Sequence, residues 1–220
     1  MNNKLTRGHQ DEAVLDPILA PIFAGIFGRK WAQMPPVMHD HYAIRSRTND
    51  LVIATGVMAI QMSFMAKLMA PFFKLTGTLV PRAGDNVKVT VRFTSGLSSD
   101  FMCFDRSFTF ADGRTERFLS KMEPVGGNQI IEWTGSGIGW RAAFTYENDK
   151  VCLSHKGYAF KLFGKIIPLP ISWLFGYGNA SEVATSDTGF DMEMTLAHPV
   201  WGMIYGYNGH FEITEISLDE

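Results

Sequence analysis

The feature that most constrains this 220-residue chain is a single arginine inside an apolar stripe. Around Arg106, large apolar side chains recur at every second position, and mostly small or polar residues lie between them. The apolar set is Met102, Phe104, Phe108 and Phe110. Side chains two residues apart share one face of a β-strand, so Arg106 points the same way as these neighbours. Because a guanidinium keeps its charge, a buried Arg106 needs an anion, either a protein carboxylate or part of a ligand.

Composition indicates a globular protein and argues against several kinds of partner. Hydrophobic residues make up 46% of the chain and charged residues 19%, which is typical of a domain with a sizeable core. The 20 basic and 22 acidic residues form no basic run, so a nucleic-acid partner is not expected. Two cysteines, Cys103 and Cys152, cannot build a disulfide framework and are expected to be buried thiols in a reducing compartment.

The N-terminal part of the chain is expected to be separate in character from the rest. We divide the sequence into residues 1–30 and a single β-rich domain over residues 31–220. Residues 1–16 are expected to form a loose tail without the apolar core of a secretory signal, which favours a cytoplasmic location. Residues 17–28 are apolar but too short to span a bilayer. They predict a short helix packed on the core, with a membrane-surface anchor as the alternative.

Two further helices are predicted in the first third of the chain. Residues 31–42 are expected to form a short helix that is entered through two prolines. Methionines at helical spacing predict a second helix over residues 58–70. Pro71 should end this helix or start another short one, and Gly77 is expected as a C-terminal stop. These methionines are Met58, Met62, Met65 and Met69. Core packing explains the stripe, and an adaptable wall for an apolar ligand is the alternative.

From residue 86 onward, alternating patterns predict strands joined by connections too short for parallel crossovers. The expected strands include 87–93, 102–110, 115–123, 129–134, 140–147, 190–196 and 203–213. Residues 165–180 are expected to be loop and short helix, as a lid or a capping loop. The predicted fold is therefore α+β and mainly β. It is a large curved antiparallel sheet or barrel of about ten strands, with the N-terminal helices packed on or in it.

The register of the hairpin after Arg106 decides which side chains meet across it. A three-residue loop over residues 112–114 is predicted, which places Arg106 opposite Ser120 and Phe108 opposite Phe118. A slip of one residue would set the apolar face of one strand beside the charged face of the other.

A second hairpin is predicted around Asn148 and Asp149, which suit a tight turn. In this register Ala142 faces His155, and a small residue beside an inward histidine leaves space. His155 is therefore either a core histidine that is hydrogen-bonded to the backbone or a functional group.

Motifs for the common cofactors are missing from the sequence. It contains no glycine-rich phosphate loop, no dinucleotide fingerprint and no Gly-x-Ser-x-Gly elbow, so no cofactor is predicted. His39 and His41, which flank Asp40, are the closest pair of histidines, and residues two apart do not share a helix face. We therefore predict a surface or capping role for this pair and no metal site.

The order of several short motifs resembles an uncharacterised bacterial family, domain of unknown function 4166, over roughly residues 31–213. The motifs are Met34-Pro35-Pro36 with His41, Gly56, Leu79 to Gly84, Phe104 to Phe108 with Phe118 to Ser120, Pro168 to Pro170, Ala180 with Glu182, and His198-Pro199 before Tyr207 and Gly209. Relatives of this type occur alone or fused behind reductase-like domains, which implies a small-molecule setting and a reductase-like partner. Many members have tryptophan where Phe104 stands, which implies a different pocket shape. The resemblance supplies no catalytic residue and no substrate.

The first functional hypothesis is the binding of an apolar small molecule with an anionic end in a β-lined cavity. Arg106 would pair with the anion, and Glu182 is its main alternative partner, which would make the pair structural. The other residues expected at this site are Phe104, Phe108, Phe118, Ser120, Trp140, Phe144 and His41.

Two other functions use parts of the same sequence. A cofactor-independent enzyme of cyclase, isomerase or hydratase type would use His155 or Glu182 as a general acid or base, with Arg106 stabilising negative charge. A peripheral membrane or partner-binding protein would instead use residues 17–28 and 165–178 as an apolar contact surface.

Overall fold

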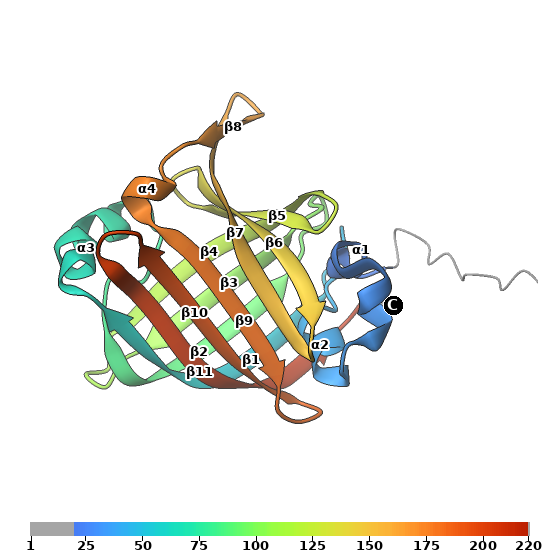
Figure 1. Cartoon of the computed structure of the whole chain (residues 1–220). Helices are drawn as coiled ribbons and strands as arrows, with labels where there is room; N and C mark the ends of the chain where they lie inside the picture. The colour runs from blue at the N-terminus through green and yellow to red at the C-terminus, as the bar shows by residue number, and fades with distance from the viewer. Residues whose placement is uncertain (1–19, 220) are drawn as a thin grey trace, which may run out of the picture.

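In the computed structural model, which describes residues 20–219, the chain forms a closed antiparallel barrel (Figure 1). Its strands are β1 (Leu51–Met62), β2 (Gly84–Thr94), β3 (Met102–Thr109), β4 (Thr115–Gly126), β5 (Gln129–Thr134), β6 (Ile138–Glu147), β7 (Lys150–Leu162), β8 (Lys165–Leu169), β9 (Tyr177–Ala184), β10 (Gly189–His198) and β11 (Gly202–Ser217). Ten strands form the ring β1-β2-β3-β4-β5-β6-β7-β9-β10-β11, in which β6 pairs with β7 and β11 pairs with β1. The strand β8 lies outside this ring beside β7. The predicted, mainly β fold of about ten antiparallel strands is confirmed.

The alternation along each strand determines what fills the barrel. Side chains on one face of a barrel strand point inward and the others point outward. On β2 the buried side chains are Val87, Val89, Val91 and Phe93, and the residues between them are exposed. On β3 the apolar stripe is buried together with Arg106, which is 9% exposed. The sequence pattern therefore assigned the inward faces of both strands correctly.

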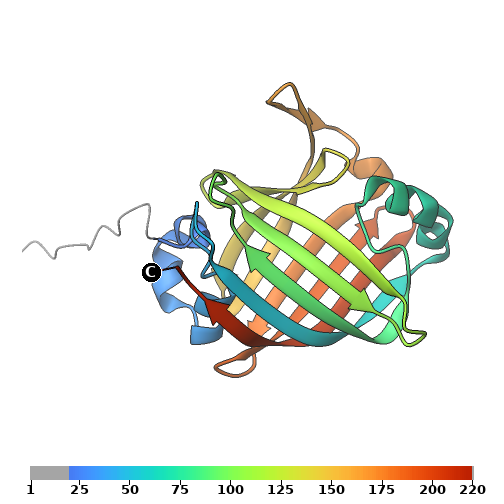
Figure 2. The ribbon, with the colours of Figure 1, turned by 180° about the vertical axis from the view of Figure 1, so that it is seen from behind.

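Three short helical segments cover one end of the barrel (Figure 2). They are α1 (Ile22–Phe27), η1 (Gly28–Gln33) and α2 (Pro36–His41), so the short helices predicted in these two regions are confirmed. Tyr42 follows α2, and its ring centroid lies 4.7 Å from that of Phe23 in α1. Both residues are almost completely buried in the same core as the barrel. The predicted tail over residues 1–16 lies outside the described residues.

The helix predicted over residues 58–70 is wrong in its first half. Strand β1 continues to Met62, and α3 (Phe64–Thr76) begins only after Ser63. The Ser63 hydroxyl accepts a hydrogen bond from a backbone N–H in the first turn, at 3.2 Å, and so caps the helix. The break expected at Pro71 is wrong, because Pro71 lies inside α3. Gly77 ends α3 in the left-handed conformation, with φ of 59°, as the sequence predicted.

The register predicted for the β3–β4 hairpin is wrong by two residues. The observed pairs are Arg106–Phe118, Phe108–Glu116 and Thr109–Thr115. The loop runs from Phe110 to Arg114 and is closed by a 3.0 Å hydrogen bond from the Phe110 N–H to the Arg114 carbonyl. A shift of two residues leaves every side chain on the same face, so the inward set is unchanged.

The hairpin between β6 and β7 has the predicted register. Ala142 pairs with His155, and the turn residues Asn148 and Asp149 both have positive φ, at 53° and 58°. Positive φ at two central residues matches the twist of the flanking strands, and these residue types tolerate it.

The end of the barrel opposite the N-terminal helices carries α3, β8 and α4 (Ser172–Phe175), as Figures 1 and 2 show. Phe72 of α3 stacks on Phe175 of α4, with ring centroids 5.6 Å apart. The short helix predicted within residues 165–180 is confirmed, but residues 165–169 and 177–180 lie in strands rather than in the expected loop. None of the helices formed by residues 20–219 is long and apolar enough to cross a bilayer.

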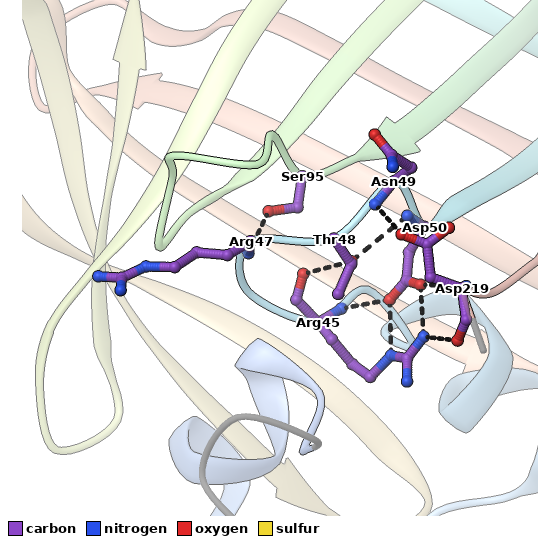
Figure 3. A network of polar contacts seen from close by, with 7 residues as sticks. All are labelled: Arg45, Arg47, Thr48, Asn49, Asp50, Ser95 and Asp219. Carbon is purple, nitrogen blue, oxygen red and sulfur yellow. Dashed lines mark hydrogen bonds and ion pairs between the residues drawn. The ribbon is translucent and has the colours of Figure 1, made fainter.

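A buried ion pair fastens the segment before β1 to the segment after β11 (Figure 3). The carboxylate of Asp50, which is fully buried, accepts hydrogen bonds from Arg45 Nε at 2.9 Å and from a terminal Arg45 nitrogen at 2.7 Å. It also accepts one from the backbone N–H of Asp219 at 2.9 Å. Burial raises the pKa of Asp50, but the hydrogen bonds from Arg45 and Asp219 outweigh burial and lower the pKa to about 2.

We expect Asp50→Asn to destabilise the barrel, because it leaves the largely buried Arg45 without its counter-charge. The free energy of unfolding in urea at neutral pH should fall by about 2–4 kcal/mol. A carboxylate with a lowered folded-state pKa contributes stability above the unfolded-state pKa and loses it as the pH falls through the folded-state pKa. In the wild type, about 2 kcal/mol should therefore disappear mostly between pH 5 and pH 2, and Asp50→Asn should lack this component.

The exposed pair of Arg47 and Asp100 provides a matched control. Arg47 Nε donates to Asp100 Oδ1 at 2.8 Å, but both side chains are more than 60% exposed. Asp100→Asn should leave the free energy of unfolding nearly unchanged, since solvent screens exposed pairs. Equal losses in the Asp50 and Asp100 variants would contradict the assigned role of the buried pair.

Candidate functional site

A cavity of about 160 Å³ lies inside the barrel, and most of its wall is apolar. At one end it is lined by His41 and Tyr42, next to the sealed end of the barrel, and at the other by Phe72 of α3 and Phe175 of α4. The predicted aromatic residues of the wall all line it: Phe104, Phe108, Phe118, Trp140 and Phe144. Tyr42 is 1% exposed whereas Phe72 is 38% exposed, so the end of the cavity at α3 and α4 is the one nearer to solvent.

Arg106 has its counter-charge inside the protein. One terminal nitrogen of Arg106 donates to Ser120 Oγ at 2.8 Å, and the other donates to Glu132 Oε1 at 3.1 Å. The Ser120 hydroxyl donates to the same Glu132 oxygen at 2.6 Å. The guanidinium also lies over two phenylalanine rings, 4.6 and 5.1 Å from their centroids, which adds a cation–π attraction. The anion that the sequence required is therefore the carboxylate of Glu132.

Glu182 forms a second polar group at the inner end of the cavity. Its carboxylate accepts a hydrogen bond from the Tyr42 hydroxyl at 2.5 Å and lies 3.6 Å from His41 Nε2. The prediction that Glu182 is the protein partner of Arg106 is therefore wrong. Glu182 contacts His41 and Tyr42, and Arg106 pairs with Glu132. Burial raises the pKa of Glu182, but the interactions of its carboxylate with His41, the Tyr42 hydroxyl and the Arg106 charge together hold that pKa below its ordinary value. Glu182 is thus ionised at neutral pH.

His41 is buried with unused hydrogen-bonding capacity. The centroid of its imidazole ring lies 4.7 Å from the ring centroid of Phe93 and 4.7 Å from that of Phe190, and the residue is 3% exposed. The surface or capping role predicted for His41 is therefore wrong. Among the described residues, neither ring nitrogen has a hydrogen-bond partner. Buried polar atoms are nearly always paired, so these two atoms mark a place where a water or a ligand atom would bind.

Tyr207 brings a further hydroxyl group to the same part of the wall. It lines the cavity, and within residues 20–219 its hydroxyl makes no hydrogen bond. The pKa of Tyr207 is raised to about 12, and burial of the hydroxyl is the main cause. The charge of Arg106 lowers this pKa, whereas the charges of Glu132 and Glu182 raise it further. The hydroxyl is therefore protonated at neutral pH and lies within the field of all three charged groups.

His155 contacts the cavity wall from outside through Trp140. It is not part of the cavity wall. Its Nδ1 accepts a hydrogen bond from Trp140 Nε1 at 3.0 Å, and its Nε2 lies 2.9 Å from Ser172 Oγ. Burial lowers the pKa of His155, so the ring is neutral at neutral pH. The observed contacts tie a residue of the wall to the first residue of α4, and the catalytic role remains a prediction.

Eight of the ten residues predicted for the site line the cavity, and the exceptions are Ser120 and His155. Ser120 still takes part through its hydrogen bonds to Arg106 and Glu132. The polar residues of the wall that were not predicted include Tyr42, Glu132 and Tyr207. A signal for Glu132 existed, because it stands two residues from the buried Ile130 on a predicted strand. The functional roles of all these residues remain predictions.

Other chemistry is limited in the part of the chain that the structure describes. No group of three or more His, Cys, Asp or Glu side chains within residues 20–219 could hold a metal ion. Cys103 and Cys152 are free thiols, and both are half-buried rather than fully buried as expected. Burial raises the pKa of the Cys103 thiol, which reduces its reactivity.

Comparison with known proteins agrees with the resemblance found in the sequence. The family model described as Domain of unknown function (DUF4166) matches residues 34–211. No functionally curated protein matches the chain. The described fold is similar to the crystal structure of Rv2717c from M. tuberculosis, with 12% identity, 74% of this chain and 91% of that chain covered, and a TM-score of 0.44.

Two other solved structures are more distant. A putative thioesterase II from Thermobifida fusca has 8% identity, 77% and 80% of the two chains covered, and a TM-score of 0.21. The dehydratase domain of the polyketide PpsC from Mycobacterium tuberculosis has 8% identity, 86% and 84% covered, and a TM-score of 0.19. The predicted cytoplasmic location and reductase-like partner remain predictions.

We expect Arg106→Met to destabilise the protein by about 3 kcal/mol in urea unfolding, because the Glu132 carboxylate would lose its counter-charge in a largely buried site. The double variant Arg106→Met with Glu132→Gln should recover most of this loss, since it removes both charges together. A double-mutant cycle measures the coupling between the two side chains. Independent, additive effects of the two substitutions would contradict an internal ion pair.

Proposed function

Since this chain belongs to the DUF4166 family, whose description states no activity, we propose from the geometry that the barrel binds an apolar small molecule with one polar end. One observation carries the proposal. An apolar cavity holds unpaired hydrogen-bonding atoms of His41 and Tyr207 within one cluster of charged side chains. A mostly apolar pocket with a few convergent polar groups is typical of a small-molecule site.

The charges of the cluster favour an uncharged polar end. Arg106 is neutralised by Glu132, and Glu182 adds a second negative charge close by. A ligand carboxylate would bring a third negative charge into a cavity with one fixed positive charge, at a cost that low-dielectric surroundings increase. A carbonyl oxygen could accept a hydrogen bond from Tyr207, and a hydroxyl could donate to His41. The anionic end predicted from the sequence remains the alternative to be tested.

The wall suits an apolar body of irregular shape. Met192 and Met194 of β10 and Met58 of β1 line the cavity beside the aromatic side chains. Methionine has three rotatable bonds and adapts to irregular neighbours, which allows one wall to fit related ligands. Of the four methionines predicted as an adaptable wall, only Met58 lines this cavity, and it lies on a strand rather than on the predicted helix.

We expect medium-chain alkanols or ketones to bind more tightly than carboxylic acids of the same chain length at neutral pH. Met194→Trp, which adds bulk inside the cavity, should weaken this binding by more than about tenfold. Isothermal titration calorimetry measures both effects. Native mass spectrometry of protein purified without detergent would show any ligand that is already bound.

Leu119→Trp provides the matched control, because it adds bulk at a position on β4 that is 52% exposed. It should leave the affinity unchanged. Tighter binding of the carboxylic acids, lost in Arg106→Met, would support the anionic end instead. Equal affinities in wild type and Met194→Trp would contradict binding in the cavity.

A cofactor-independent enzyme in the same cavity is the second candidate, and the unpaired His41 ring beside Glu182 favours it. A histidine next to an ionised carboxylate can act as a general acid or base, so the proton-transfer role moves from His155 to His41. We expect such an enzyme to convert its ligand into a product that mass spectrometry detects. This conversion should be lost in Glu182→Gln while the affinity for the ligand falls less than tenfold. Recovery of unchanged ligand from the wild type would leave binding alone.

A further inference from the structure

Exposed apolar side chains gather at the open end of the barrel. They belong to three segments, residues 64–75, 162–177 and 200–203, which together we name the apolar rim. These segments include α3, the β7–β8 turn, α4 and the β10–β11 turn, which are spread from the left side to the top of Figure 1 and from the right side to the top of Figure 2. Of the 20 large hydrophobic residues with high exposure among those described, 14 lie in the rim. Such a patch on a folded protein marks an interaction surface.

The helix α3 is apolar on two faces. Its inner face buries Ala66 and Phe73, while Phe64 and Leu75 on the outer face are 79% and 86% exposed. A helix that is hydrophobic all round is expected only where apolar material covers both sides. Within the described residues the barrel covers one side of α3, so the outer face lacks its apolar cover.

The tip of the β7–β8 hairpin displays an aromatic side chain at a strained position. Phe163 has a φ of 48° and is 95% exposed, and Gly164 beside it also has positive φ. Bulky residues rarely adopt positive φ, whereas the β6–β7 turn uses Asn148 and Asp149 at the equivalent places. Neither packing nor turn geometry explains a phenylalanine here, which points to an external contact.

The charge of the rim has one sign. Its segments and the adjoining Lys161 contain four lysines and no aspartate or glutamate. Lys161 pairs with Glu123 at 3.1 Å, but Lys67, Lys74 and Lys165 have no acidic partner among the described residues. Lysine around exposed apolar and tryptophan side chains is complementary to a bilayer surface that contains anionic lipids.

We propose that the apolar rim docks on an anionic lipid bilayer. Residues 165–178 belong to this surface, as the sequence suggested. The other segment predicted for it, residues 17–28, does not, because α1 buries Phe23 and Phe27 at the opposite end of the barrel. In its place the rim uses α3 and the β10–β11 turn, whose Trp201 is 47% exposed.

The rim is continuous with the cavity. Phe72 of α3 and Phe175 of α4 line the cavity, and their stacked rings form the end of its wall that belongs to the rim. A docked rim would therefore connect the apolar interior of the bilayer with the apolar interior of the barrel. This transfer of ligand rests on the proposed function, whereas docking itself does not.

Sedimentation of the full chain with lipid vesicles tests the docking. The protein should bind vesicles of phosphatidylcholine with phosphatidylglycerol, and bind much less to phosphatidylcholine alone or at high salt. The double variant Phe163→Asn with Trp173→Ser should bind at least about tenfold less, as should Lys67→Glu with Lys74→Glu. Asparagine tolerates positive φ, so the first variant also removes the strain at position 163 and should fold at least as well as the wild type.

Matched control variants carry the same kinds of substitution at exposed positions outside the apolar rim. Leu97→Ser with Leu119→Ser removes exposed apolar side chains outside the rim, and Lys30→Glu with Lys88→Glu reverses charges outside it. Both should bind vesicles like the wild type. The proposal is overturned if the wild type does not bind vesicles, or if binding falls equally in the controls and the rim variants. A stable dimer in which a second copy covers the rim would also overturn it.

The two proposals can fail separately. Vesicle binding is measured without ligand, and ligand affinity is measured without vesicles. Rim variants should keep the ligand affinity of the wild type, whereas Met194→Trp should keep the vesicle binding. A protein that binds vesicles but no ligand would retain the docking and lose the transfer.

Discussion

The pairing of β6 with β7, which closes the sheet, is the constraint on which the rest of the structure depends. A closed barrel has no free edges, and its interior widens with the number of strands. Ten strands enclose more space than their inward side chains fill, so the interior must be occupied in another way. At one end the N-terminal helices fill it with aromatic side chains, and towards the other end a cavity remains.

Closure also requires close approach where the first and last strands of the ring meet. Gly56 on β1 pairs with Phe211 on β11, and a Cβ atom at Gly56 would collide with that ring. Gly209 on β11 likewise has no room for a side chain beside Met58. The Arg45–Asp50 pair then fastens the chain at the end of the same two strands. Backbone pairing, glycines and one buried ion pair thus all act where β1 meets β11.

The interior tolerates charge because each charged group has a local partner. Arg106 is satisfied by Glu132 and Ser120, and Glu182 by Tyr42 and by the adjacent His41. An ion pair of this kind adds little stability over an apolar pair, since desolvation offsets most of the Coulomb attraction. The Arg106–Glu132 pair therefore contributes charge and hydrogen-bonding groups to the cavity wall more than it contributes stability.

Alternation along strands was readable from the sequence, whereas contacts between strands were not. The period of two fixed the inward faces of β2 and β3, and a register error of two residues left them intact. The partner of Arg106 is Glu132, which lies two strands away in the sheet. A pattern within one strand cannot predict a contact with a residue on another strand. The methionine run misled because positions 58 and 62 satisfy both a helical spacing of four and a strand spacing of two. Tertiary pairing with β2 and β11 decided for the strand.

The two ends of the barrel differ in a way that fixes how an amphiphile would enter. The sealed end holds the polar cluster of His41 and Glu182, and the open end holds the apolar rim. In a bilayer, the polar end of an amphiphile lies at the surface and the apolar body lies beneath it. A rim docked on that surface would receive the polar end first, while the apolar body stays in lipid until the cavity wall replaces it. Entry with the polar end first therefore exposes no apolar surface to water, and it delivers that end to the part of the cavity where hydrogen-bonding atoms lack partners.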